Sequence, residues 1–138
     1  MPSFSTRVTT HEGGEILEIL CDGKPWGETY TWDDHFRFGP FKAHLIVAAE
    51  SIVSDFLESD GARPSRGETI VAREDRVYPA FSARCSTYDS FIVRGRRIDR
   101  PYLQLKRGPG SIAFGVLKAE ALIVLMEKVK IFAWSHPT

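Results

Sequence analysis

The segment PSFSTRVTT at residues 2–10 recurs 77 positions later as PAFSARCST at residues 79–87, with five of the nine positions identical. A second pair, FGPFKA at 38–43 and FGVLKA at 114–119, agrees at four of six positions with an offset of 76. Self-similarity at a fixed period is the mark of a repeated structural unit. Two matches in nearly one register therefore predict that the chain contains one unit twice.

Each copy reads as several strands followed by one helix. The strands predicted from apolar alternation, given for the first copy and then the second, are 3–10 and 80–87, 15–21 and 91–97, 26–32 and 102–107, and 35–38 and 111–114. We expect the first repeat at residues 2–60, a connector at 61–77 that contains an extra strand at 68–72, and the second repeat at 78–138. The predicted fold is α+β: one domain, 1–138, of two tandem ββββα repeats with antiparallel sheets packed on two helices.

Apolar residues at helical spacing predict a helix that begins at Pro40 and ends before Gly61, with a copy from Leu117 to Trp134. Residues 121–126 are apolar on every side of this second helix. Such a helix is buried by more than one neighbour. We expect it to lie under its own sheet and also against the other repeat or a second subunit.

Composition narrows the class of protein. Of the 138 residues, 43% are apolar and 26% are charged, which is typical of a folded globular domain. The longest apolar run is too short to cross a membrane, and the first residues lack the pattern of a secretory signal. Cys21 and Cys85 are expected to be buried and reduced. These features together favour a cytoplasmic protein.

The formal net charge is zero, which argues against a protein that coats nucleic acid by bulk charge alone. The charges are unevenly distributed, however. Residues 76–107 hold eight basic and two acidic side chains, whereas residues 1–38 hold three basic and seven acidic side chains. The local net charges of +6 and −4 indicate either a charged binding face or two halves that attract each other.

Strand alternation divides the second repeat into two faces. The apolar face, expected to pack on a helix, comprises Phe81, Ala83, Cys85, Phe91, Val93, Leu103 and Leu105. The outward face comprises Ser82, Arg84, Ser86, Ile92, Arg94, Arg96, Tyr102, Gln104 and Lys106. Cations and hydroxyls contact phosphates and a ring stacks on any base, so this mixture is typical of single-stranded nucleic-acid binding. The alternative is a solvated basic edge that discourages aggregation and pairs with the acidic first half.

The corresponding face of the first repeat presents Arg7 and, at alternate positions of one predicted strand, Trp26, Tyr30 and Trp32. Either these three aromatic side chains form a stacking platform for bases, or the strand has its faces exchanged and they belong to the core. The sequence leaves both interpretations open.

Signals for catalysis are weak. The four histidines, at positions 11, 35, 44 and 136, show no paired spacing for a metal ion. The segment from Trp32 to His35 contains acid and base side chains, but it aligns with the Gly-Pro-Gly turn at 108–110, so a turn is the favoured interpretation. We therefore expect a protein that is not an enzyme, with no catalytic residues, no metal and no cofactor.

Two tandem units of four antiparallel strands and a helix resemble the Whirly and Pur-alpha families and the related transcriptional positive-cofactor fold. That resemblance covers nearly the whole chain and concerns its architecture. It implies binding of single-stranded DNA or RNA across the sheets, often by oligomers.

The leading hypothesis is a non-enzymatic binder of single-stranded nucleic acid, such as a transcription or replication accessory factor. Its expected contact residues are Arg84, Arg94, Arg96, Tyr102, Lys106, Trp26, Tyr30, Trp32 and Arg7. The alternative is a homo-oligomeric protein-interaction scaffold, with the apolar helix 116–134 at the contact between subunits. A small-molecule pocket between the sheets is a third interpretation.

Overall fold

Three short turns fold the strands of this protein back on one another. The computed structural model describes residues 2–29, 35–61, 67–73 and 76–136. Within them, the pairs Glu12-Gly13, Asp22-Gly23 and Arg94-Gly95 all have positive φ angles, of 50° to 53° at the first residue and 77° to 81° at the glycine. Two successive positive φ angles are the geometry of the tight turn that best matches the twist of paired antiparallel strands. Each turn therefore joins two neighbouring strands.

The first sheet is built around one central strand. Its strands are β1 (Phe4–His11), β2 (Gly14–Cys21), β3 (Lys24–Pro25) and β4 (Arg37–Phe38), and the single helical turn α1 (Trp26–Thr29) follows β3. β1 pairs antiparallel with the whole of β2, and β3 and β4 both pair with β2. β2 alternates buried Leu17, Ile19 and Cys21 toward the helices.

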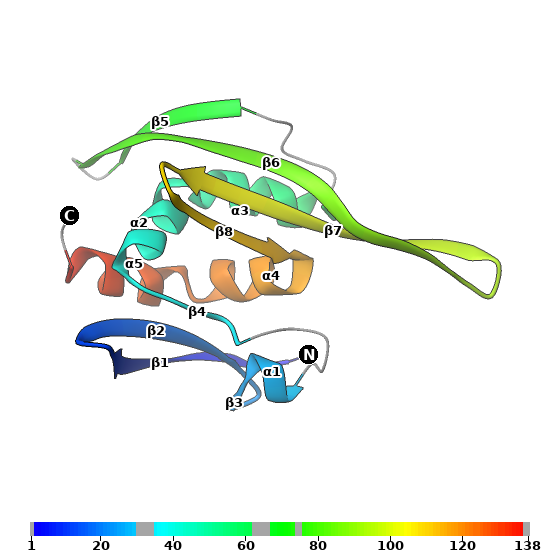
Figure 1. Ribbon diagram of the computed structural model, residues 1–138, viewed down its shortest axis with the longest axis horizontal. Helices are drawn as coiled ribbons and strands as arrows, with labels where there is room; N and C mark the ends of the chain where they lie inside the picture. The colour runs from blue at the N-terminus through cyan, green and yellow to red at the C-terminus, as the bar shows by residue number, and fades with distance from the viewer. Residues whose placement is uncertain (1, 30–34, 62–66, 74–75, 137–138) are drawn as a thin grey trace.

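The second sheet has the order β5-β6-β7-β8, with every pair antiparallel. These strands are β5 (Gly67–Arg73), β6 (Arg76–Val93), β7 (Arg96–Arg107) and β8 (Gly110–Gly115). β6 and β7 form a hairpin that projects well beyond the rest of the molecule (Figure 1). The predicted coarse fold, α+β with antiparallel sheets, is confirmed.

Four helices follow the two sheets in pairs. They are α2 (Pro40–Ala48) and α3 (Glu50–Glu58), and α4 (Val116–Val124) and α5 (Met126–Trp134). Both predicted helices are thus found, but each is broken at one residue that leaves helical geometry: Ala49, with φ −95° and ψ 14°, and Leu125, with φ −101° and ψ 15°. Both starting positions and both breaks are 76 residues apart. No helix in the described part of the chain is long and apolar enough to span a membrane.

The helices lie between the two sheets (Figure 1), where α2 contacts β4 of the first sheet and α4 contacts β8 of the second. α2 contacts β7 and β8, where the Arg107 guanidinium lies 4.4 Å from the centre of the Phe41 ring. Conversely, the Lys118 ammonium on α4 lies 5.3 Å from the centre of the Phe36 ring, beside β4. α2 also packs on α5, and α3 packs on α4. The second helix pair is therefore covered by several neighbours, as its apolar surface predicted.

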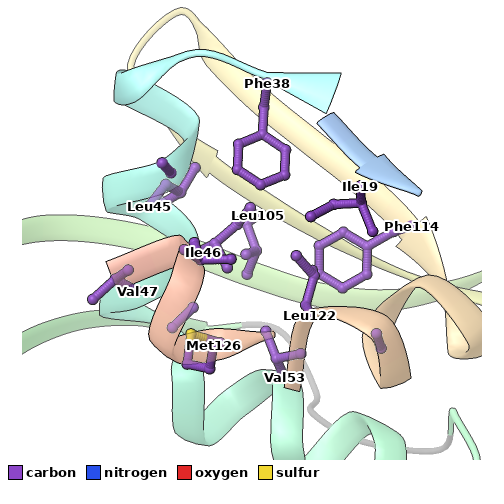
Figure 2. Packing of buried hydrophobic residues seen from close by; sticks show 14 of the residues in the cluster. Ile19, Phe38, Leu45, Ile46, Val47, Val53, Leu105, Phe114, Leu122 and Met126 are labelled. Atoms are coloured by element: carbon purple, nitrogen blue, oxygen red, sulfur yellow. The ribbon is translucent and has the colours of Figure 1, made fainter. Parts of the chain in front are cut away.

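All of these elements share one hydrophobic core. Figure 2 shows Ile19 and Phe38 from the first sheet, Leu105 and Phe114 from the second, and residues of all four long helices gathered in one cluster. Burial of large apolar side chains is the main favourable contribution to folding. Because both sheets and both helix pairs supply it, this core requires residues from both ends of the chain.

Polar contacts join the helix pairs and tie down the end of α5. The buried ammonium of Lys130 on α5 lies 3.2 Å from a carboxylate oxygen of Glu50 on α3. Just after α5, the backbone carbonyl of His136 accepts a hydrogen bond from Nε2 of buried His44, at 2.9 Å. The Nε2 atom of His136 in turn lies 3.5 Å from a carboxylate oxygen of Glu15 on β2.

Two predicted strands are wrong. The segment 26–32 is not a third strand, because Trp26–Thr29 forms α1, and residues 30–34 lie outside the described residues. The segment 91–97 is not a separate second strand, because it contains the Arg94-Gly95 turn between β6 and β7. The extra strand expected at 68–72 in the connector is confirmed as β5.

Cross-strand pairing explains the second error. Matching pairs are Arg7 with Glu18 in the first sheet and Arg84 with Gln104 in the second, so the first strands are offset by 77 residues and the central strands by 86. The next strands, at Phe38 and Phe114, return to an offset of 76. The second half has a longer hairpin and the first half contains β3 and α1, so a constant offset aligned the wrong strands.

Candidate nucleic-acid interface

The second sheet has a buried face and an outer face. Phe81, Ala83, Leu103, Leu105 and Phe114 are buried against the helices. Successive side chains on a strand point to opposite sides of the sheet, so the residues between them face away from the helices. The predicted division into two faces is confirmed for these described positions on β6 and β7, and Cys85 is half-buried on the inner side.

Strand register arranges the outer face in three rows across β6, β7 and β8. The rows are Ser82, Lys106 and Ser111; Arg84, Gln104 and Ala113; and Ser86, Tyr102 and Gly115. We call these nine residues the outer face. The β8 positions carry only small side chains. Tyr102 and Lys106 can therefore be approached from the β8 side of the outer face.

On the outer face, the hydrogen-bond partner of Arg84 is a neutral side chain. The Nε–H of Arg84 donates a hydrogen bond to Oε1 of Gln104, at 3.0 Å, and both atoms belong to solvent-accessible side chains. Because glutamine is neutral, this bond orients the guanidinium without neutralising it. Lys106 is exposed, and Tyr102 is half-buried.

The first sheet has a corresponding row of residues, but its arginine is paired with an acid. Arg7 lies opposite Glu18, which lies opposite Arg37. Glu18 is 4% exposed; it accepts a hydrogen bond from the Arg7 guanidinium, and its other oxygen lies 3.2 Å from Nδ1 of His35. Arg7, proposed from the sequence as a nucleic-acid contact, is therefore already paired with an acid.

The environment of Glu18 favours its charged form. Burial by itself raises the pKa of this carboxyl, but hydrogen bonds and positive charge from Arg7 and His35 outweigh that effect and leave the pKa below its ordinary value of 4.5. The first sheet thus has a fixed negative charge at the position where the second sheet has neutral Gln104.

Beyond the outer face, β6 and β7 continue alone. β5 pairs with β6 only as far as Ala83, and β8 pairs with β7 only as far as Tyr102. We call residues 87–101 the arm. It contains a register shift between Thr87 and Ser90 and ends in the Arg94-Gly95 turn.

The arm corrects two details of the predicted outward face. Arg94 occupies the turn, with φ 53°, rather than a strand position. The register shift adds one residue to β6, so Ile92 pairs with Arg97 instead of Arg96. Ile92 therefore lies on the side of the arm opposite to Arg96. Ile92, Arg94 and Arg96 are all exposed.

The predicted aromatic platform of the first repeat is not formed at Trp26. Its side chain is fully buried, stacked on Phe4 with ring centres 6.2 Å apart and edge-on to Phe36 at 5.5 Å. Of the two interpretations left open by the sequence, burial is the correct one for Trp26. Tyr30 and Trp32 lie outside the described residues. Tyr102 is therefore the aromatic side chain on the outer face.

Sequence reasoning missed the partners of these residues. Glu18 was visible, but its pairing with Arg7 depends on the hairpin register, and its contact with His35 depends on the path of the chain after α1. Ser111 and Ala113 could have been found, because they alternate with Ile112 and buried Phe114. Alternation on β8 was the available signal.

In the part of the chain that the structure describes, no three His, Cys, Asp or Glu side chains come together as a metal site. His35, from the segment considered for catalysis, contacts Glu18. Comparisons with protein-family models, with curated proteins and with solved structures find no match to this chain.

Proposed function

We propose that this protein binds single-stranded nucleic acid without catalysing a reaction, as an accessory factor of transcription or replication. Its binding surface is the outer face of the second sheet, continued by Arg94 and Arg96 on the arm. The observation that carries the proposal is the neutral Gln104 between exposed cations, which leaves Arg84 and Lys106 available for phosphates.

The chemistry of the outer face suits this ligand. Serine hydroxyls at positions 86 and 111 flank the cations and offer hydrogen bonds to phosphates and sugars. Tyr102 offers one ring for stacking, an interaction of about 1–3 kcal/mol per base that is tolerant of sequence. This combination favours a ligand with unstacked bases and a low sequence preference.

Contrast between the two sheets supports a single binding surface. Glu18 neutralises the basic row of the first sheet, where Arg7 is held in an ion pair. The second sheet has no acid at the matching position, because register places Gln104 there. Nucleic acid therefore binds the second sheet in preference to the first.

We also propose that the two halves are copies of one unit that resembles the Whirly and Pur-alpha arrangement. Its support is the constant offset of 76 residues in both helices and in both helix breaks. Matching strand order adds to this, since β1-β2-β4 and β6-β7-β8 each surround a central strand. The unit would contain three strands and a broken helix, with β3, α1 and β5 as additions.

Titration of a fluorescently labelled dT oligonucleotide, followed by anisotropy at several salt concentrations, tests the binding proposal. We expect binding that weakens with salt. The variant Gln104→Glu reproduces the acid of the first sheet and should weaken binding by about 3- to 10-fold. The slope of the logarithm of the binding constant against the logarithm of the salt concentration should become shallower by about 0.7 for each phosphate that the variant no longer binds. The matched control is Glu18→Gln, which removes the acid from the first sheet and should not weaken binding.

Absence of dT binding at low salt would reject the proposal. Equal losses in Gln104→Glu and Glu18→Gln would place the nucleic acid elsewhere, or would show that the sheets respond only to a change in folding. Circular dichroism of each variant separates these two cases.

A homo-oligomeric scaffold is the second candidate, and one observation favours it. Val124 and Ile131 lie seven residues apart on the second helix pair and are 62% and 61% exposed. Most other apolar residues of 116–134 are buried within the chain, so any contact between subunits on this helix pair would use these two. Light scattering of the wild type and of Val124→Ser/Ile131→Ser measures whether they join subunits; a monomeric wild type contradicts the scaffold.

A further inference from the structure

We propose that the arm binds duplex DNA next to the single strand, so that the protein recognises a junction between single-stranded and double-stranded DNA. This inference rests on the proposed function, because the outer face supplies the single-stranded half of the junction. The arm supplies the other half.

The arm has the shape of a two-stranded ribbon. Its first pair is Thr87 with Pro101 and its last is Val93 with Arg96, and neither β5 nor β8 pairs with it. Figure 1 shows this hairpin extending away from the sheets and helices. An isolated two-stranded hairpin is only marginally stable in water. A long ribbon outside the core is therefore an element that a bound partner would stabilise.

Charge identifies the partner. Arg94 lies in the turn and Arg96 follows it; both are exposed and form no ion pair with another described residue. Two exposed guanidinium groups at the end of a ribbon attract a polyanion. Guanidinium also donates paired hydrogen bonds to phosphate and to the guanine edge, which lysine does not match geometrically.

Dimensions favour duplex DNA over duplex RNA. The major groove of B-form DNA, about 12 Å wide, admits a two-stranded β-ribbon. The major groove of A-form RNA is deep and narrow, so side chains cannot read it. A ribbon tipped with arginine therefore fits the first groove and is excluded from the second.

The two surfaces are continuous at the root of the arm. Tyr102 lies on the last row of the outer face, and Pro101, the residue before it, is the first arm residue on β7. A strand that leaves the duplex would therefore meet the Tyr102 ring directly. Stacking on this ring would favour the base at the point where pairing ends.

Three labelled DNA probes test the proposal: single-stranded dT, a blunt duplex, and the same duplex with a dT tail. Anisotropy titrations at one salt concentration should show the tailed duplex binding about 10-fold more tightly than dT, and the blunt duplex binding more weakly than the tailed one. An RNA duplex with the same tail should bind no more tightly than dT.

The variant Arg94→Ser/Arg96→Ser should weaken binding of the tailed duplex more than binding of dT, so that the preference for the tailed duplex is lost. Its salt slope on the tailed duplex should fall by about 2, since each bound phosphate contributes about 0.9. The matched control, Lys24→Ser/Lys128→Ser, removes two exposed cations that lie outside both surfaces and should leave all probes unchanged.

Outcomes distinguish this inference from the proposed function. If dT binds but the tailed duplex gains nothing, or if the control variant loses the preference equally, the junction proposal is overturned while single-strand binding stands. If dT does not bind and the blunt duplex does, the outer face is rejected and the junction proposal fails with it.

Discussion

Glu18 and Gln104 occupy matching positions on the central strands of the two sheets. Each lies opposite an arginine, Arg7 or Arg84, and each accepts a hydrogen bond from it. Only Glu18 carries a charge, and it is almost fully buried. A buried carboxylate is stable only when its partners satisfy it, so Glu18, Arg7 and His35 form one unit. One difference in charge therefore distinguishes a face that is already neutralised from one that is not.

The first prediction concerns the pH dependence of this unit. Because the pKa of Glu18 is lowered in the folded protein, its carboxylate stabilises the fold fully above the ordinary value of 4.5, and this contribution is lost as the pH falls through the lower folded value. Glu18→Gln should therefore reduce the free energy of unfolding by about 1–2 kcal/mol at pH 7. Urea denaturation should show the gap between wild type and variant closing toward pH 3.

Glu28→Gln serves as the control, because Glu28 is exposed and its replacement should change stability by less than about 0.5 kcal/mol at any pH. A gap for Glu18→Gln that stays constant down to pH 3 would contradict the assignment.

Among the elements, the end of α3 against β7 fixes the first helix pair on the second sheet. After α3 the chain turns at Asp60 and Gly61, with φ 57° and 89°, and the N–H of Gly61 donates to the carbonyl of Phe56 at 2.9 Å. A Cβ atom at Gly61 would lie 2.4 Å from Cγ of Pro101 on β7. Glycine is required here both by backbone geometry and by the close approach of another element.

Gly61→Ala should lower the free energy of unfolding by about 2–4 kcal/mol, the sum of left-handed backbone strain and the clash with the rigid proline ring. Gly23→Ala is the matched comparison, because Gly23 has φ 78° and open space around it, and it should cost only about 1 kcal/mol. Thermal or urea denaturation of both variants measures the difference. Equal losses would mean that α3 does not press on β7 in solution.

Local sequence signals predicted some elements and not others. Alternation at Phe81, Ala83, Leu103 and Leu105 depends only on the strand itself, so the two faces of β6 and β7 were predictable. The Arg94-Gly95 turn lacks the asparagine or aspartate that usually marks such a turn, and it was placed inside a strand.

The strand predicted at Trp26 is wrong for a different reason. Its spacing with Tyr30 and Trp32 mimics a strand, but burial against Phe4 and Phe36 accompanies a helical turn at α1. Tertiary packing outweighs local pattern in so short a segment. The outer face was thus predictable from alternation. The neutralisation of Arg7 was not, because it depends on the cross-strand register, and a shift of one residue would change that register.

At the scale of the whole molecule, the helices of both halves share the space between the two sheets. α2 contacts β7 and β8, and Lys118 of α4 lies over rings of the first sheet. The core cluster includes buried residues from every sheet and every long helix. Neither residues 2–61 nor residues 67–136 therefore contain a complete core, and the fold depends on their association.

Separate fragments 1–61 and 67–138 should each lack a cooperative unfolding transition, because each contains only part of the shared core. Mixed in equal amounts, they should regain the helical circular dichroism signal and elute together in size-exclusion chromatography. A fragment that unfolds cooperatively by itself would contradict the dependence on a shared core.

The shared core also has a consequence for synthesis of the protein. Leu17 and Ile19 leave the ribosome long before residues 116–134 have been translated. The helix pair formed by residues 116–134 is part of the core in which Leu17 and Ile19 are buried. Until then, the apolar side chains of the first sheet lack their native packing partners. Exposed apolar surface of this kind is what chaperones bind. We therefore expect native folding of the first sheet to await translation of the second helix pair.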